Sequence, residues 1–202
     1  MARWIYYSNG DRRIMALTRL NNRSISAVTE LPSNLITGED LPPGSILQAV
    51  YGSYSSFPAT SDGSTWHNYQ AITITPKSAS STILIQHVVS YGGVDNSYAA
   101  GRLIRDSSQV LRLGNALYAE SHFTDASYGL QMNANANDQY KMWNTYFQIT
   151  DTPNTTSQVS YQFQYRPDAS NRQVDINYSQ TNPSNGYNPP PWTSTTLLEI
   201  AG

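Results

Sequence analysis

The chain has 202 residues, enough for one sizeable hydrophobic core, and a formal net charge of −2. Only 13% of the residues are charged, and Ser, Thr, Asn and Gln fill most polar positions. This composition, with Tyr as the commonest aromatic residue, is typical of half-buried β surface rather than of solvated helices. The small negative charge argues against nucleic acid as a partner, and the lack of Cys excludes disulfides and thiolate metal sites.

The first segment is unlike the rest in charge and in pattern. Residues 1–23 carry five Arg against one Asp, a local charge of +4, whereas the other residues carry 7 basic and 13 acidic groups, or −6. The apolar residues that follow, up to residue 40, keep no long helical or strand period. The breaker Leu-Pro-Pro-Gly-Ser at 41–45 ends the segment. We predict an extended N-terminal arm and linker over 1–44, followed by a head domain over 45–202.

Neither a secretion signal nor a membrane span is expected from the sequence. The opening residues lack the long apolar run of a signal peptide. The longest apolar stretches are far shorter than the roughly 20 residues that span a bilayer. We therefore expect a protein made in a cytoplasm, without a membrane partner.

From residue 45 onward the apolar residues recur with a period of two, which predicts strands. The first predicted strand lies at 45–54, and Asp62-Gly63 marks a turn after it. The stretch 67–76 is a second strand that Pro76 ends. Its two predicted faces are Tyr69, Ala71 and Thr73 against Gln70, Ile72 and Ile74.

A third predicted strand, 82–91, follows the connection 77–81. One of its faces is apolar except for one histidine: Ile83, Ile85, His87, Val89 and Tyr91. Two strands joined by so short a connection are typical of an antiparallel sheet.

The second half of the chain repeats this scheme. Residues 102–105 and 110–113 flank Asp-Ser-Ser-Gln, which predicts a hairpin with a tight turn. Four further strands are predicted in the ranges 140–153, 157–167, 172–179 and 194–202. Short strands at regular spacing, without a convincing long helix, predict an all-β fold, an antiparallel β-sandwich or jelly roll.

Histidine and acidic residues are the first candidates for chemistry. His87 lies on an apolar strand face, which favours a hydrogen-bonded core or interface histidine over a metal ligand. His122 lies near Glu120 and Asp125, a trio that suits a divalent ion but suits an ordinary polar loop better. His67 has no informative spacing. We therefore predict no metal site.

The remaining enzyme classes find little support in the sequence. Serines are abundant, but no nucleophile elbow and no phosphate-binding glycine spacing occurs. Glycoside cleavage needs two carboxyl groups across a groove. The candidate aspartates are all predicted to cap or bend turns: Asp125, Asp138, Asp151, Asp168 and Asp175. We predict no catalytic residue and no cofactor.

Exposed aromatic residues are the better candidates for binding. Trp66, Tyr187 and Trp192 fall in or beside predicted loops, and the loop 179–194 is stiffened by four prolines. Sugar rings stack on aromatic faces, so these residues are possible glycan or host contacts. The alternative is that they pack against neighbouring loops or adjacent subunits.

Four stretches carry a resemblance to a known group of proteins. They are PGSILQAVYGSYSS, ITITPKSASSTILIQ, DTPNTTSQVSYQFQYR and the terminal TTLLEIAG, preceded by MALTRLNNRSISAVTELPSN. In this order and spacing the chain, from Met15 onward, resembles small structural proteins of tailed phages, especially marine and cyanobacterial ones. These are described as virion structural, tail-fibre-like or head-decoration proteins. Residues 1–14 and the loop 179–194 depart from the resemblance, so nothing carries over to them.

The resemblance implies a non-enzymatic virion protein with a trimeric β head. Its partners would be itself and, through residues 1–40, another virion protein such as a capsid, tail or adaptor protein. The predicted attachment residues are Arg3, Trp4, Ile5, Tyr6, Tyr7, Arg12, Arg13, Leu17 and Leu20. The localisation would be the virion. Two alternatives stay open, a fibre module that binds a host surface glycan and, less favoured, a polysaccharide depolymerase.

Overall fold

A computed structural model describes residues 41–56, 58–93, 98–112, 125–131, 141–170, 172–179 and 192–202. All of them belong to one compact unit, Thr37–Gly202. These ranges contain strands and turns but no helix, and accordingly none of their segments is a helix that could cross a membrane. Most of the predicted arm, residues 1–40, lies outside the described residues.

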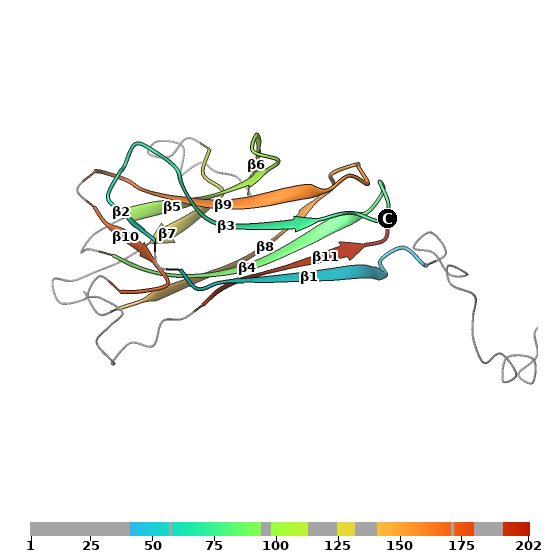
Figure 1. The fold of residues 1–202 in the computed structure, drawn as a ribbon, viewed down its shortest axis with the longest axis horizontal. Coiled ribbons are helices and arrows are strands. Elements are labelled where there is room, and N and C mark those ends of the chain that lie inside the picture. Colours follow the sequence, from blue (N-terminus) through green and yellow to red (C-terminus); the bar gives the residue numbers. More distant parts are fainter. Residues whose placement is uncertain are drawn as a thin grey trace, which may run out of the picture. The chain divides into compact units, whose positions relative to one another are not determined.

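The described residues form eleven strands, whose arrangement is drawn in Figure 1. In chain order they are β1 (Ile46–Tyr54), β2 (Ala59–Thr60), β3 (His67–Ile74), β4 (Thr82–Gly93), β5 (Tyr98–Arg105), β6 (Gln109–Leu111), β7 (Tyr128–Gln131), β8 (Trp143–Asp151), β9 (Val159–Pro167), β10 (Val174–Ile176) and β11 (Thr193–Ile200).

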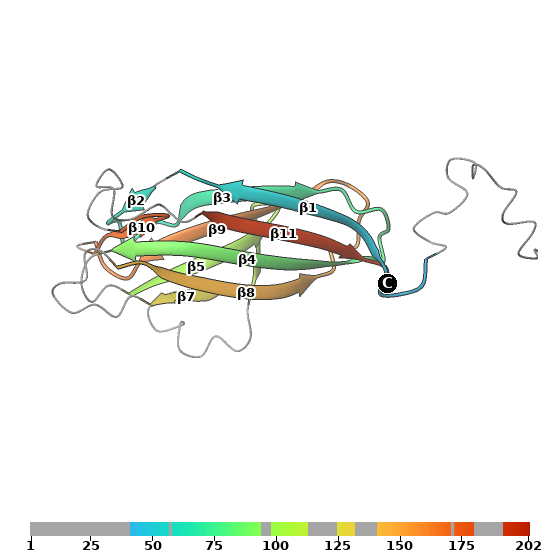
Figure 2. The same ribbon diagram turned by 90° about the horizontal axis from the view of Figure 1, so that it is seen from below.

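The strands form two antiparallel sheets that pack face to face (Figures 1 and 2). Sheet A has the order β1-β11-β4-β8, and β10 and β2 continue it beyond the end of β11 along the same side of β4. Sheet B has the order β3-β9-β5, with β6 and β7 one after the other along the outer side of β5. The predicted antiparallel β-sandwich is confirmed.

The pairing follows one long hairpin wrapped around itself. The first long strand pairs with the last, β1 with β11, and the next pairs inward are β3 with β9 and β4 with β8. The innermost pair is β5 with β6 and β7. Strands that are partners in this hairpin stay paired, while the long strands β1, β3, β4, β5, β8, β9 and β11 alternate between the sheets in chain order, which gives the jelly-roll order.

The core lies between the sheets and is built by alternation along each strand. The predicted apolar face of β4 is confirmed, because all five of its side chains are buried. From the opposite sheet, Tyr161, Phe163 and Tyr165 of β9 point inward and are at most 1% exposed. These Tyr-rich positions therefore belong to the core, as the alternation in β9 predicts.

The predicted faces of β3 are wrong at one residue. Gln70, Ile72 and Ile74 are buried and Ala71 is exposed, as alternation requires, but Tyr69 is also buried, at 3% exposed. The register between β3 and β9 shifts between Asn68 and Gln70. Tyr69 is the extra residue of this β-bulge, and the bulge turns its side chain into the core.

Both described ends of the chain meet at one end of the sandwich. The backbone N–H of Gly44 donates to the carbonyl of Ala201, and the N–H of Ala201 donates to the carbonyl of Ser45, each at 2.8 Å. The predicted boundary at 41–45 is therefore the place where the chain joins the first strand. The opposite end of the sandwich, where β2 and β10 lie, is the end toward which β1 and β4 run (Figure 1).

Candidate functional site

His87 is the centre of a chain of hydrogen bonds that crosses the core. Its Nε2 lies 2.7 Å from the hydroxyl of Tyr69, which lies 2.6 Å from the hydroxyl of Tyr128. Its Nδ1 lies 2.8 Å from Oγ1 of Thr195, which donates to Oε1 of Gln70 at 3.0 Å. The His87 ring also stacks on Phe163 of the other sheet, with centroids 4.0 Å apart. The predicted core histidine is confirmed.

The donors and acceptors in this set of hydrogen bonds are consistent with only one direction of donation. Because Thr195 donates to Gln70, its oxygen accepts from the N–H at Nδ1 of His87. Nε2 of His87 is then the acceptor for the Tyr69 hydroxyl, and the Tyr69 oxygen accepts from Tyr128. Every member is neutral, and every proton already has an acceptor.

Burial keeps these groups neutral. Desolvation lowers the pKa of His87 to about 3 and raises the pKa values of Tyr69 and Tyr128 above their usual range. A general base works best with a pKa near the working pH and within reach of a substrate. His87 meets neither condition, since its side chain is 0% exposed. This set of hydrogen-bonded side chains around His87 is a structural tie between the two sheets rather than a reaction centre.

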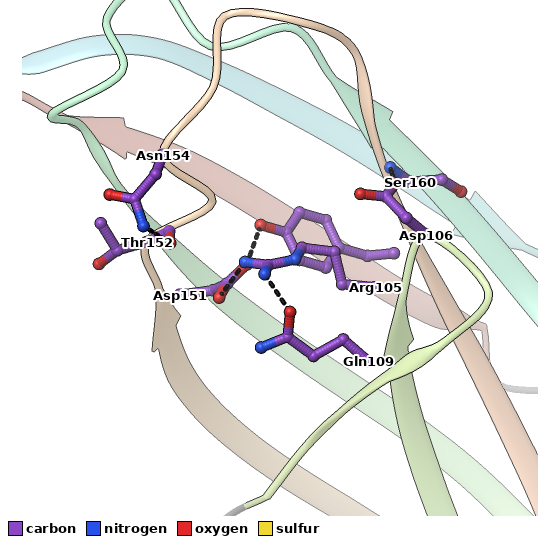
Figure 3. Close-up of polar contacts among 8 residues, drawn as sticks. Arg105, Asp106, Gln109, Asp151, Thr152, Asn154 and Ser160 are labelled. Carbon is purple, nitrogen blue, oxygen red and sulfur yellow. Dashed lines mark hydrogen bonds and ion pairs between the residues drawn. The ribbon is translucent and has the colours of Figure 1, made fainter.

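A second tie joins the sheets at the end of β8 (Figure 3). Nη1 of Arg105 donates to both carboxylate oxygens of Asp151, at 2.7 and 2.8 Å, and the Tyr161 hydroxyl donates to Oδ2 at 2.7 Å. Nη2 of Arg105 bonds Gln109 across the predicted hairpin. The prediction of a turn-capping role for Asp151 is wrong, because this carboxylate is the buried acceptor of a cross-sheet ion pair.

The hairpin beside this tie has the predicted tight turn. Asp106 and Ser107 both have positive φ, 49° and 64°, as turns between tightly paired strands favour. Oδ1 of Asp106 accepts from the backbone N–H of Ser160, which fixes the turn against β9 (Figure 3).

A third tie lies at the end where the chain joins β1. Glu199 is 0% exposed, and its Oε1 accepts from the backbone N–H groups of Lys77 and Ser78 at 2.7 and 3.2 Å. Its Oε2 accepts from Nε2 of Gln48 at 2.6 Å. These bonds hold the β3–β4 connection against the two strands β1 and β11. Both carboxylate oxygens of Glu199 therefore accept hydrogen bonds that hold the fold together.

A fourth tie fixes the opposite end. The Asn177 amide donates to the carbonyls of Tyr54 and Ser56 at 2.9 and 3.0 Å, and its oxygen accepts from Thr193 at 2.7 Å. Asn177 has φ 65°, a left-handed conformation that Asn tolerates well. The last residue of β1, the residues just after it and the first residue of β11 are therefore held together.

Asp175 contradicts its predicted turn role. It lies within β10, is 0% exposed and accepts from Nε2 of Gln173 at 2.5 Å. Burial raises its pKa, while hydrogen bonds from Gln173 and Tyr178 oppose the rise. The carboxyl group is buried within sheet A, where β10 pairs with both β2 and β4. It faces no second carboxylate across a groove in the described part of the chain.

The predicted aromatic contacts have different surroundings. Trp66 is half-buried against Ala100 and Ala126, and the guanidinium groups of Arg102 and Arg166 lie over its ring, 4.6 and 5.1 Å from the centroid. A sugar would have to displace a guanidinium to stack there.

Trp192 stands out from the surface instead. It is 63% exposed and directly precedes Thr193, which Asn177 holds. Tyr187 and the prolines of the same loop lie outside the described residues. Of the predicted contact residues, Trp192 is the one whose ring is available for stacking in the described structure.

The remaining histidine and acidic residues considered in the sequence form no metal centre in the described residues. His67 lies 3.1 Å from Oγ1 of Thr60 and 3.6 Å from Oδ2 of Asp62. Hydrogen bonds from Ser64 lower the pKa of Asp62, which forms the predicted turn. No group of three or more His, Asp or Glu suited to a metal occurs in this part of the chain.

Two further sets of predicted residues lie partly or wholly outside the described ranges. Asp125 is described, and Arg112 lies 3.3 Å from its Oδ1, but His122 and Glu120 are not described. The predicted virion-attachment residues lie outside as well: Arg3, Trp4, Ile5, Tyr6, Tyr7, Arg12, Arg13, Leu17 and Leu20.

Comparison with protein-family models finds no match for the chain, and comparison with curated proteins finds none either. The resemblance to tailed-phage structural proteins therefore stays a prediction.

Proposed function

We propose that the chain is a non-enzymatic virion structural protein of a tailed phage, a trimeric fibre or decoration protein. Residues 1–40 attach it to another virion protein, and the β-sandwich is the displayed head. The jelly-roll order of the strands supports this proposal, because it is a common architecture of viral capsid and lectin domains. Fold alone does not specify function, so the proposal needs support from the arrangement of the chain itself.

The observation that carries the proposal is the position of the two ends of the sandwich. The chain joins β1 beside Ala201, whereas Tyr54, Gly93 and Trp192 lie at the far end of their strands. A head attached through residues before Leu41 therefore has its opposite end free to face outward. The Asn177 tie keeps the frame of that end rigid.

The hydrogen-bond partners of the buried polar groups support a structural role for the sandwich. In the described residues, His87, Asp151 and Glu199 each bond partners from other strands and act as ties between elements. A sandwich whose strands are joined by such buried bonds suits a particle exposed to proteases, because local opening is what proteases exploit.

Deletion of residues 1–40 tests the attachment role. We expect the truncated head to be soluble, to melt cooperatively and to be missing from assembled particles, because its core lies wholly within residues 41–202. The full chain supplied in the same way is the control. Normal incorporation of the truncated head would show that the arm is not the attachment device.

A host-glycan-binding module is the second candidate, favoured by the exposure of Trp192. An exposed, rigidly based indole ring is a stacking surface for sugars. A glycan array with the full chain tests it, and Trp192→Ala should remove any binding found. Trp66→Ala is the matched control, since its ring is already covered by guanidinium groups.

A further inference from the structure

The outer face of sheet A carries no charged side chain over three complete rows of its four long strands. The pairing sets the rows directly: Ala49–Leu198–Leu84–Thr150, Tyr51–Thr196–Gln86–Gln148 and Ser53–Ser194–Val88–Tyr146. A further row toward the chain ends is Ile46–Ile200–Thr82. Tyr51, Tyr146 and Ile46 are 68%, 59% and 60% exposed.

The outer face of sheet B is built differently. It carries Arg102 and Arg166, and Trp66 packs over it together with Ala126. Its residues Ala100 and Ile104 are consequently buried, at 2% and 5% exposed. Around Trp66 sheet B is covered by its own chain, whereas no described segment packs over the rows of sheet A.

The size of the uncharged face suits a specific protein contact. Four strands about 4.8 Å apart, over about eight residues of about 3.4 Å each, span roughly 500 Å² of flat area. Because side chains project from the sheet, the solvent-accessible area of the face is larger than this flat area. It approaches the roughly 800 Å² that each partner buries in a standard interface. Six of the twelve residues in the three rows are apolar or aromatic, and a lack of charged residues is typical of the core of protein interfaces.

The chemistry of the face selects its partner. Without Lys or Arg it offers nothing to nucleic acid or an anionic surface, and without Asp or Glu it offers nothing to a basic peptide. The chain's own residues 1–23, with a net charge of +4, would find no carboxylate on these rows. An identical uncharged face meets no electrostatic repulsion, and its side-chain amides and hydroxyls can hydrogen-bond amides and hydroxyls of a second copy.

We infer that the outer face of sheet A is the surface through which copies of this chain associate around a symmetry axis. Leu84, Leu198, Val88 and Tyr51 supply the apolar contacts, and Gln86, Gln148 and Thr196 supply polar pairs between them. The inference requires that copies of the chain associate, but it does not rest on their location in a virion. An experiment can therefore contradict the association surface without contradicting the proposed function, and the reverse.

Single-cysteine variants of the full chain test the position of the contact, because the natural chain has no Cys. Thr196→Cys lies in the middle row, and Thr73→Cys is its matched control, exposed on the outer side of β3. With a bismaleimide at micromolar protein we expect covalent multimers of Thr196→Cys and at least about tenfold fewer of Thr73→Cys. Equal cross-linking of the two variants would overturn the inference.

Charge substitutions test the energy of the contact. The double variant Leu84→Glu/Leu198→Glu brings like charges together at the centre of the face, and we expect association at least about 100-fold weaker by sedimentation. Ala71→Glu, on the outer side of sheet B, should leave association unchanged. Should the double variant fail to fold, Gln148→Arg, at an exposed position, takes its place.

Three results would contradict the inference. They are a full chain that is monomeric at tens of micromolar, association that survives these substitutions unchanged, and a monomer that associates only after residues 1–40 are deleted. The last result would show that the chain's own arm covers the face. Association through this face in a protein absent from particles would leave the inference standing and remove the proposed function.

Discussion

At the scale of single residues, His87 links the stability of the sandwich to pH. Its pKa is about 3 in the folded protein and about 6.5 in an unfolded chain. Between these values the unfolded state binds the proton and the folded state does not. Stability is therefore fully present above pH 6.5 and decreases as the pH falls, by at most about 1.4 kcal/mol per pH unit.

We predict that His87→Gln flattens this pH dependence between pH 6.5 and 5, where most carboxylates remain ionised. Urea unfolding at several pH values measures it, with the natural chain compared at each pH. The variant itself should be less stable at pH 8, because Gln cannot reproduce both bonds and the stacking on Phe163. An unchanged slope in the variant would show that His87 is not the titrating group.

Gly101 is the second residue with a sharp prediction. A Cβ at this position would lie 1.9 Å from the ring of Tyr128, the first member of the His87 chain. We expect Gly101→Ala to destabilise the fold by about 1–3 kcal/mol through overpacking. Gly129→Ala is the matched control, because nothing lies within 4 Å of its Cβ. Similar melting temperatures for the two variants would contradict the packing argument.

At the scale of elements, the ion pair of Arg105 and Asp151 fastens β8 to β5. The side chains are 16% and 7% exposed, so removing one partner leaves a poorly solvated charge. We predict that Arg105→Met costs about 3 kcal/mol in chemical unfolding and that the added change Asp151→Asn recovers part of the loss. Arg112→Met, in the exposed pair with Asp125, should cost less than about 1 kcal/mol. Equal costs for the two arginines would disprove the tie.

Elements also show what the sequence can predict. Alternation identified β4 and β9 and their buried faces, because every second residue over most of each strand, apart from His87, is a large apolar or aromatic one. It missed β2 and β7, with two and four residues, because so short a run has no measurable period. It misplaced Tyr69 because a bulge adds one residue to a strand without any sign in the pattern.

The ties between elements were harder to predict than the elements. Thr195 lies 108 residues from His87, and Arg105 lies 46 residues from Asp151, so their pairing depends on the strand order. Asp175 resembles a turn residue in the sequence, but its carboxyl group is buried within sheet A, where β10 pairs with both β2 and β4. The uncharged rows of sheet A likewise become visible only once the register of four strands is known.

At the scale of the whole molecule, each region of the chain has a separate proposed task. One end of the sandwich joins residues 1–40 and the opposite end carries Trp192, and we propose that the outer face of sheet A contacts further copies. Repetition on a particle raises avidity by roughly 10²–10⁴ where geometry permits, so weak single contacts by such a head are sufficient.

The central claim is that the chain is a component of a virion, and microscopy of intact particles tests it most directly. Particles carrying the full chain with a label after Gly202 should show the label at repeated, symmetric positions. Because the C-terminus lies beside the junction with residues 41–45, the label should lie close to the particle surface. Purified particles without the label would contradict the proposed function, and a label on the outermost end of the head would contradict its orientation.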